Sequence, residues 1–155
     1  LHRGEGSGLD AEDQVPDGMD IGLISINLEE ETLEYAGANS PAYIVRNGDV
    51  IELKPDKRAI ASFEPGTHTY TTHKVPLHDG DMVYCASDGY ADQFGGPKGR
   101  KFMRKRFRGL LSEMAVMPVE EQEDQLQSRI ENWRREAEED QVDDILVCGV
   151  RIRLG

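Results

Sequence analysis

Short apolar runs of strand length follow one another through the first half of the chain. Residues 21–27 and 33–37 form two such runs, separated by a polar turn. The runs at 43–45 and 50–53 flank Arg46-Asn47-Gly48-Asp49. Asn-Gly between apolar runs predicts a β-hairpin, because both central residues of a type I′ turn need positive φ.

A second pair of apolar runs, at 70–77 and 81–86, follows a loop that we expect at 59–67. His78-Asp79-Gly80 separates these two runs, and such a turn sequence predicts another hairpin. The first 86 residues are therefore expected to contribute strands only.

The pattern becomes helical after Asp88-Gly89. Residues 91–100 form a glycine-rich loop, and apolar residues then recur at i, i+4, i+7, i+8 and i+11, which predicts an amphipathic helix. Pro118 suits the first turn of a second helix, and the apolar run at 145–152 predicts a terminal strand. The apolar faces of the two helices are Met103, Phe107, Leu110, Leu111 and Met114 in the first, and Val119, Leu126, Ile130, Trp133 and Ala137 in the second.

This order of elements predicts one antiparallel α+β domain in residues 21–155. It consists of about six strands, two helices and a final strand, with no internal repeat. Residues 1–20 are rich in glycine and acidic side chains without any period, so we expect a flexible acidic segment there.

The composition narrows the class of protein. The 155 residues carry 18 Lys and Arg against 30 Asp and Glu, and this acidic balance argues against a nucleic-acid-binding protein. No stretch approaches the roughly 20 apolar residues that a membrane span requires. Cys85 and Cys148 lie in apolar runs and no signal peptide precedes them, so we expect small core residues in a cytoplasmic protein.

Carboxylates at the ends of strands are the candidates for chemistry. The histidines lack the spacing of a zinc site, and the chain has no P-loop, G-x-S-x-G or G-x-G-x-x-G motif. Asp88 ends an apolar strand face that begins at Met82, because side chains alternate along a strand. Asp143 and Asp144 open the terminal strand. Oxygen ligands held on a rigid sheet suit Mg²⁺ or Mn²⁺.

Both acidic positions also have a simpler interpretation. Asp-Gly pairs occur at Asp17, Asp79 and Asp88, and most such pairs are turns. Asp143 and Asp144 close the stretch 118–144, in which acidic residues far outnumber basic ones, as is typical of a solvated helix face. Spacing alone leaves both interpretations open.

Several motifs together resemble those of a known family. Residues 87–96 (SDGYADQFGG) and 141–145 (QVDDI) are similar to the bacterial SpoIIE-type phosphatases of the metal-dependent protein phosphatase (PPM) superfamily. Residues 17–21 (DGMDI), 34–41 (EYAGANSP) and 46–48 (RNG) match the middle of the same family. The similarity therefore covers nearly the whole chain.

The resemblance implies a β-sandwich flanked by helices, with a binuclear Mn²⁺ or Mg²⁺ centre at one end. It implies a serine/threonine phosphatase that acts through a metal-activated water, often on anti-sigma-factor antagonists of partner-switching systems. Asp88 and Asp143 match metal ligands of the family. Only one of two neighbouring strand residues can face the metals, and the resemblance favours Asp143 over Asp144.

The sequence departs from the family pattern in two places. Leu146 stands where the family usually has Thr, and nothing before Ile21 resembles the family's first strands, whose Gly-Asp supplies a bridging carboxylate. We therefore expect the C-terminal part of a phosphatase domain, without its N-terminal strands. With two carboxylates for two divalent ions, we expect weak Mn²⁺ binding and negligible hydrolysis. The alternative is a non-catalytic, phosphatase-like module that binds a signalling partner.

Basic residues gather in 98–108 (KGRKFMRKRFR), which holds seven of the chain's 18 Lys and Arg residues. On a helix, Lys101, Arg104, Lys105 and Arg108 share one face. Either this face is solvated and balances the acidic helix, or Arg104 and Lys105 dock a phosphoprotein substrate or an acidic partner. An incomplete sandwich also exposes strand edges, so we expect a homodimer or a larger assembly.

Overall fold

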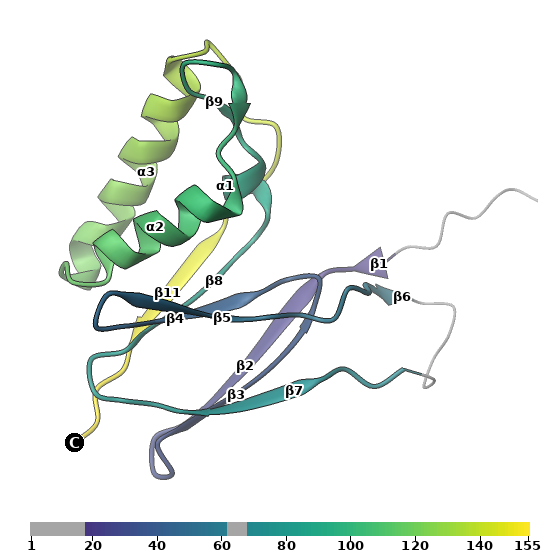
Figure 1. Cartoon of the computed structure of the whole chain (residues 1–155), viewed down its shortest axis with the longest axis vertical. Helices are drawn as coiled ribbons and strands as arrows, with labels where there is room; N and C mark the ends of the chain where they lie inside the picture. The colour runs from purple at the N-terminus through teal and green to yellow at the C-terminus, as the bar shows by residue number, and fades with distance from the viewer. Residues whose placement is uncertain (1–17, 62–67) are drawn as a thin grey trace, which may run out of the picture.

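A computed structural model describes residues 18–61 and 68–155 of the chain (Figure 1). Its named strands pair antiparallel, and its helices gather in the second half of the sequence. The predicted α+β architecture is thereby confirmed. The expected segment 1–20 and the expected loop 59–67 lie mostly outside the described residues.

One layer of the molecule is a three-stranded sheet with the order β2-β3-β7. Its strands are β2 (Ile21–Asn27), β3 (Thr32–Ala38) and β7 (Thr72–Pro76). Burial alternates along β2 and β7, as expected for strands with one face on the core and one outside.

The second layer is a four-stranded sheet with the order β11-β8-β4-β5. It contains β4 (Ala42–Arg46), β5 (Asp49–Leu53), β8 (Met82–Ala86) and β11 (Val147–Arg151). Asn47 and Gly48, which join β4 to β5, have φ of 51° and 87°. This turn confirms the predicted type I′ hairpin.

The helices cover the outer face of the four-stranded sheet, so the molecule has three layers (Figure 1). They are α2 (Arg104–Met114) and α3 (Val119–Arg135). The core between the two sheets contains Leu33, Tyr35, Ala42, Ile44, Leu53, Leu77, Val83 and Ile152. The core under the helices contains Tyr43, Val45, Met82, Tyr84, Tyr90, Phe102, Phe107, Leu110, Leu111, Met114, Ala115 and Ile130.

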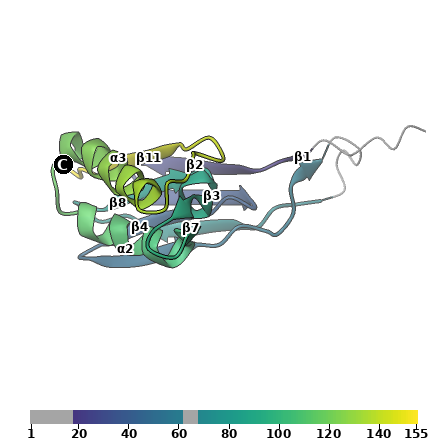
Figure 2. The same cartoon turned by 90° about the horizontal axis from the view of Figure 1, so that it is seen from above.

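The remaining elements are too short for a periodic pattern to reveal them. The strands β1 (Gly18–Met19) and β6 (Ile60–Ala61) pair with each other and protrude from the layers in both views (Figures 1 and 2). Inside the expected glycine-rich loop, β9 (Phe94–Gly95) pairs with β10 (Arg100–Lys101). A short helix, α1 (Gly89–Asp92), follows β8.

The hairpin predicted from residues 70–77 and 81–86 is wrong. β7 pairs with β3, whereas β8 pairs with β4 and β11, so the turn between them carries the chain from one sheet to the other. The buried carboxylate of Asp81 holds this crossing in place. It accepts hydrogen bonds from Arg46 Nε (2.9 Å), Arg46 Nη2 (2.7 Å) and the His78 N–H (2.9 Å).

The sequence predicted that both cysteines are core residues, but Cys85 is only partly buried and neither belongs to a core cluster. Cys85 of β8 and Cys148 of β11 are directly opposite each other in the antiparallel register, but Cys148 is exposed. The reason is that β11 forms the edge of its sheet. No helix within residues 18–61 and 68–155 has the length and apolar content needed to cross a membrane.

We predict that Arg46→Ala lowers the free energy of unfolding by about 3 kcal/mol, because it leaves the Asp81 carboxylate buried without its cation. The Asp81 side chain is 1% exposed and that of Arg46 is 20% exposed. Urea unfolding would measure the loss. The control is Lys74→Ala, which breaks an exposed ion pair with Glu30 and should leave stability nearly unchanged. Equal effects of the two substitutions would contradict the prediction.

The same ion pair predicts a pH dependence. Burial alone would raise the pKa of Asp81, but the hydrogen bonds from Arg46 and His78 hold this pKa below its ordinary value. The stabilisation from the charged carboxylate is therefore complete above about pH 4 and is lost as the pH falls through the lowered pKa. The difference in unfolding free energy between wild type and Arg46→Ala should be constant from neutral pH to pH 5 and shrink in stronger acid. A difference that grows on acidification would contradict this sign.

Candidate active site

Asp88 stands just beyond the end of a buried strand. β8 ends at Ala86, and Asp88 is already in a helical conformation (φ −73°, ψ −17°) as the N-cap of α1. Met82 and Tyr84 do share the strand face that packs on the helices, as expected. Asp88 does not continue that face, because the strand has ended, and its side chain is exposed.

The segment that contains Asp143 and Asp144 runs alongside this turn. The N–H of Ser87 donates to the Leu146 carbonyl (2.9 Å), and the Ser87 hydroxyl donates to the Asp144 carbonyl (2.9 Å). The same hydroxyl accepts a hydrogen bond from the Leu146 N–H (3.0 Å). Two motifs that are more than fifty residues apart in sequence are therefore held side by side by one serine.

Gly89 allows this contact because it has no side chain. A Cβ at this position would collide with the Asp144 carbonyl oxygen. The glycine of the Ser-Asp-Gly motif is therefore required by a close approach of two backbone segments.

The later residues of the 87–96 motif form a loop that is held against α3 by hydrogen bonds. The Trp133 indole donates to the Gln93 carbonyl (3.1 Å), and the Gly96 N–H donates to the Trp133 carbonyl (2.7 Å). A Cβ at Gly95 or Gly96 would collide with Trp133. These residues have a packing role and keep the turn at Asp88 in place.

The three candidate carboxylates are all exposed. They are Asp88, Asp143 and Asp144, and none of them forms an ion pair within the described residues. Asp143 Oδ1 accepts a hydrogen bond from the Asp144 N–H (2.8 Å), which fixes the local turn. Free carboxylate oxygens are suitable ligands for a hard divalent cation. Within residues 18–61 and 68–155, however, no group of three or more acidic, His or Cys side chains is close enough to hold a metal ion. These carboxylates are therefore suitable ligands for a hard cation, but they are too few for a binuclear centre.

Asp88 and Ser87 line a cleft of about 810 Å³. Its walls come from the ends of β4 and β5 and from the first turn of α2. Asp20 also lines this cleft and accepts a hydrogen bond from Asn39 (2.8 Å), whereas Asp17 lies outside the described residues.

The two basic residues that the sequence indicated, Arg104 and Lys105, differ in their position relative to the cleft. Arg104 lines the cleft beside Asp88, and Lys105 does not. Other cations of the stretch 98–108 have local partners: Lys101 pairs with Asp92 (3.1 Å) and Arg108 with Glu52 (2.8 Å). The expected continuous basic face is therefore partly neutralised.

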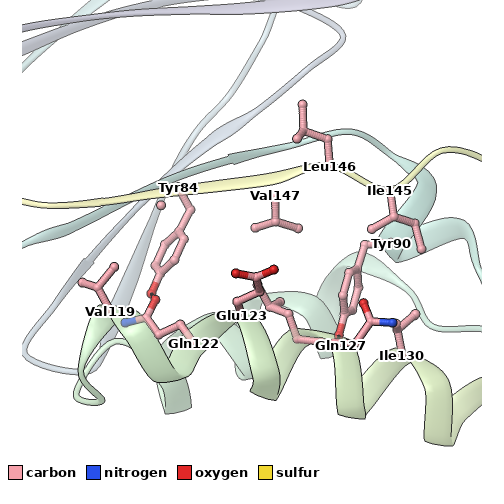
Figure 3. Close-up of a pocket in the computed structure, with 12 residues that line it drawn as sticks. Tyr84, Tyr90, Val119, Gln122, Glu123, Gln127, Ile130, Ile145, Leu146 and Val147 are labelled. Atoms are coloured by element: carbon pink, nitrogen blue, oxygen red, sulfur yellow. Dashed lines mark hydrogen bonds between the residues drawn. The ribbon is translucent and has the colours of Figure 1, made fainter.

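A second hollow, of about 470 Å³, lies between α3 and the strands β8 and β11 (Figure 3). Two of its polar side chains, Tyr84 and Gln122, bond to each other and to the backbone. The Tyr84 hydroxyl donates to Gln122 Oε1 (2.8 Å), and Gln122 Nε2 donates to the Met114 carbonyl (3.0 Å). Burial raises the pKa of Tyr84 to about 12, so its hydroxyl remains a donor at neutral pH. We interpret this hollow as a packing feature.

The comparisons with known proteins identify the class. The family described as Stage II sporulation protein E (SpoIIE) matches residues 10–153, so the chain belongs to this family. The resemblance noted in the sequence is thereby confirmed. A comparison with curated protein sequences finds no match.

Several solved structures share the fold. The SiaA-PP2C domain of Pseudomonas aeruginosa is 33% identical with a TM-score of 0.77, and the match covers 86% of this chain and 51% of that one. The SpoIIE phosphatase domain of Bacillus subtilis is 21% identical with a TM-score of 0.63 (88% and 57% covered). The Mycobacterium tuberculosis serine/threonine phosphatase PstP/Ppp is 15% identical with a TM-score of 0.61 (88% and 60% covered). The chain has a PP2C-type phosphatase fold and spans between half and three fifths of the length of these structures.

We predict that Gly89→Ala destabilises the protein by about 1–3 kcal/mol, because the new methyl group forces the Asp88 turn away from Asp144. Gly109→Ala is the matched control. Gly109 lies in α2 with open space around it, so alanine there should be neutral or stabilising by up to about 1 kcal/mol. Thermal unfolding of both variants would test this. Equal melting temperatures would contradict the proposed close contact.

Proposed function

We propose that this chain is part of a metal-dependent protein serine/threonine phosphatase. The observation that carries the proposal is the Ser87 contact, which holds the Ser-Asp-Gly turn beside Asp143 and Asp144 in a fold of the SpoIIE family. The Asp88 carboxylate, which is exposed, lines the cleft and forms no ion pair with any described residue, adds support.

In this proposal Asp88 and Asp143 are ligands of Mn²⁺ or Mg²⁺, and Asp144 is the alternative to Asp143. When bound, such ions supply the Lewis acidity that activates a water for attack on phosphorus. The residues of this chain position that chemistry: Ser87 ties the two acidic motifs together, and Gly89 lets them approach. Because the nucleophile is water, we expect no phosphorylated enzyme intermediate.

The described residues supply too few ligands for two divalent ions. We propose that the remaining carboxylates come from residues other than those described, which agrees with the greater length of the solved structures. The chain by itself should therefore bind Mn²⁺ weakly and hydrolyse p-nitrophenyl phosphate at a negligible rate.

Metal titration tests the ligand assignment. Asp88→Asn and Asp143→Asn keep the side-chain shape but remove the charge, and each should weaken Mn²⁺ binding by about tenfold or more, since loss of an outer-shell partner alone costs 10–100-fold. Asp144→Asn should have a smaller effect. Calorimetric titration with Mn²⁺ would measure the affinities, with circular dichroism to confirm the fold. A larger effect of Asp144→Asn than of Asp143→Asn would reverse the assignment, and no effect of Asp88→Asn would refute it.

We propose a phosphoprotein of a cytoplasmic bacterial signalling system, such as an anti-sigma-factor antagonist, as the substrate. The second candidate function is a non-catalytic module that binds the phosphoprotein without hydrolysis. It is favoured because residues 18–61 and 68–155 contain no group of three or more acidic, His or Cys side chains that could hold a metal ion. Phosphate release from a phosphoserine peptide by the full natural protein with Mn²⁺, abolished by Asp88→Asn, would support the enzyme. Peptide binding without any release would support the module.

We also propose that the chain self-associates through the free edge of β11. In this edge region Leu146 and Val150 are 68% and 46% exposed, and unpaired edge strands readily pair with another chain. Light scattering should show a dimer for wild type and a monomer for Val150→Lys. The control is Leu28→Lys at a 56% exposed site in the turn between β2 and β3, which belong to the other sheet, and this variant should remain dimeric. A wild-type monomer at high protein concentration would refute this proposal.

A further inference from the structure

Three cationic side chains line the cleft that contains Asp88. Lys54 and Lys57 follow β5, and Arg104 is the first residue of α2. All three are exposed, and none forms an ion pair or hydrogen bond within the described residues. We call these three residues the cationic wall.

The segment that holds the two lysines is anchored firmly. Asp56, between them, donates its N–H to the Gly37 carbonyl (2.9 Å), and its own carbonyl accepts the Asn39 N–H (2.9 Å). Its carboxylate accepts hydrogen bonds from the N–H (2.6 Å) and hydroxyl (3.0 Å) of Thr71. Lys54 and Lys57 therefore flank a fixed point of the backbone.

The cleft is also lined by acidic side chains. Glu52 is paired with Arg108, whereas Asp88 and Asp20, which is bonded only to the neutral Asn39 amide, keep their negative charges. The chain as a whole has a net charge of −12, so acidic partners are plentiful elsewhere. Among the described residues, the three cations of the wall outnumber these two carboxylates, so the positive side of the cleft attracts a multiply charged anion.

The chemistry of these side chains fits a phosphate monoester. A phosphorylated side chain carries a charge of about −1.5 to −2 at neutral pH and three strong acceptor oxygens. Arginine binds such oxygens in a bidentate manner, and lysines act as point charges for phosphate or for nearby carboxylates.

We propose that the cationic wall recognises the substrate, binding the phosphoryl group and adjacent acidic side chains of a phosphorylated protein segment. This inference rests on the proposed phosphatase function and specifies its substrate class: phosphoserine or phosphothreonine in an acidic context. It also assigns different roles to two neighbouring residues, since Arg104 lines the cleft and Lys105 does not.

The test measures binding without metal, in EDTA, to a fluorescent peptide that carries phosphoserine flanked by Asp and Glu. The triple variant Lys54→Ala/Lys57→Ala/Arg104→Ala should bind it about tenfold or more weakly, as expected when charge-assisted hydrogen bonds to phosphate are lost. Lys105→Ala removes the same kind of charge one residue away and should change the affinity by less than about twofold. Arg104→Lys should retain part of the affinity that Arg104→Ala loses.

Two outcomes would overturn the inference: equal affinity for the phosphorylated and unphosphorylated peptides, or an equal loss in Lys105→Ala and Arg104→Ala. The experiment also separates this inference from the proposed function. Phosphopeptide binding in EDTA without hydrolysis in Mn²⁺ by the full natural protein would support the wall and refute catalysis. Mn²⁺-dependent hydrolysis with a KM that is unchanged in the triple variant would support catalysis and refute the role of the cationic wall in substrate binding.

Discussion

The candidate site depends on one contact between two backbone segments, formed by Ser87 and Gly89 on one side and by residues 144–146 on the other. The Ser87 hydroxyl both donates and accepts, so it satisfies two backbone groups at once. Gly89 permits the approach because any side chain would collide with the Asp144 carbonyl. The antiparallel pairing of β8 with β11 delivers the two segments to the same end of the sheet, which is why both acidic motifs meet there.

At their opposite ends, β4 and β8 are held by a buried ion pair. β8 begins beside Asp81 and β4 ends at Arg46, and these two residues form the buried ion pair that holds the crossing between the sheets. The cleft lies at the other end of β4, near Tyr43. A rigid, doubly covered sheet thus connects a structural ion pair at one end to a set of free charges at the other. Within the part of the chain that the structure describes, the buried Asp81 carboxylate therefore has a cation beside it, whereas the exposed Asp88, Asp143 and Asp144 form no ion pair.

Local sequence patterns predicted the elements better than their connections. Apolar runs of strand length identified β2 and β3, and Asn47-Gly48 identified a hairpin, because these signals depend only on neighbouring residues. The turn after β7 looks like a hairpin turn as well, yet the chain crosses to the other sheet there. The deciding interaction, between Arg46 and Asp81, joins residues 35 apart, so no local pattern contains it.

The site shows the same limit. The Ser-Asp-Gly and Asp-Asp motifs indicated Asp88 and Asp143, but the bridging role of Ser87 depends on a contact with Asp144 across 57 positions. Lys54 and Lys57 belong to no motif, and only the fold brings them to the cleft of Asp88 and Arg104.

The cleft that contains Asp88 is lined by both acidic and basic side chains, and electrostatics gives each set a separate effect on a phosphate. A phosphate dianion approaching Asp88 is repelled unless positive charge compensates, and at a few ångströms each such interaction is worth several kcal/mol when partly shielded from water. Bound metal ions would provide part of that compensation at the carboxylates. The cationic wall provides positive charge that does not depend on metal. Its residues come from different elements, since Lys54 and Lys57 follow β5 and Arg104 begins α2. In the phosphatase that we propose, Asp88 would help to hold the metal ions, and the cations would hold the phosphate. Because the cations act without metal, their contribution is measured separately by binding experiments in the absence of metal.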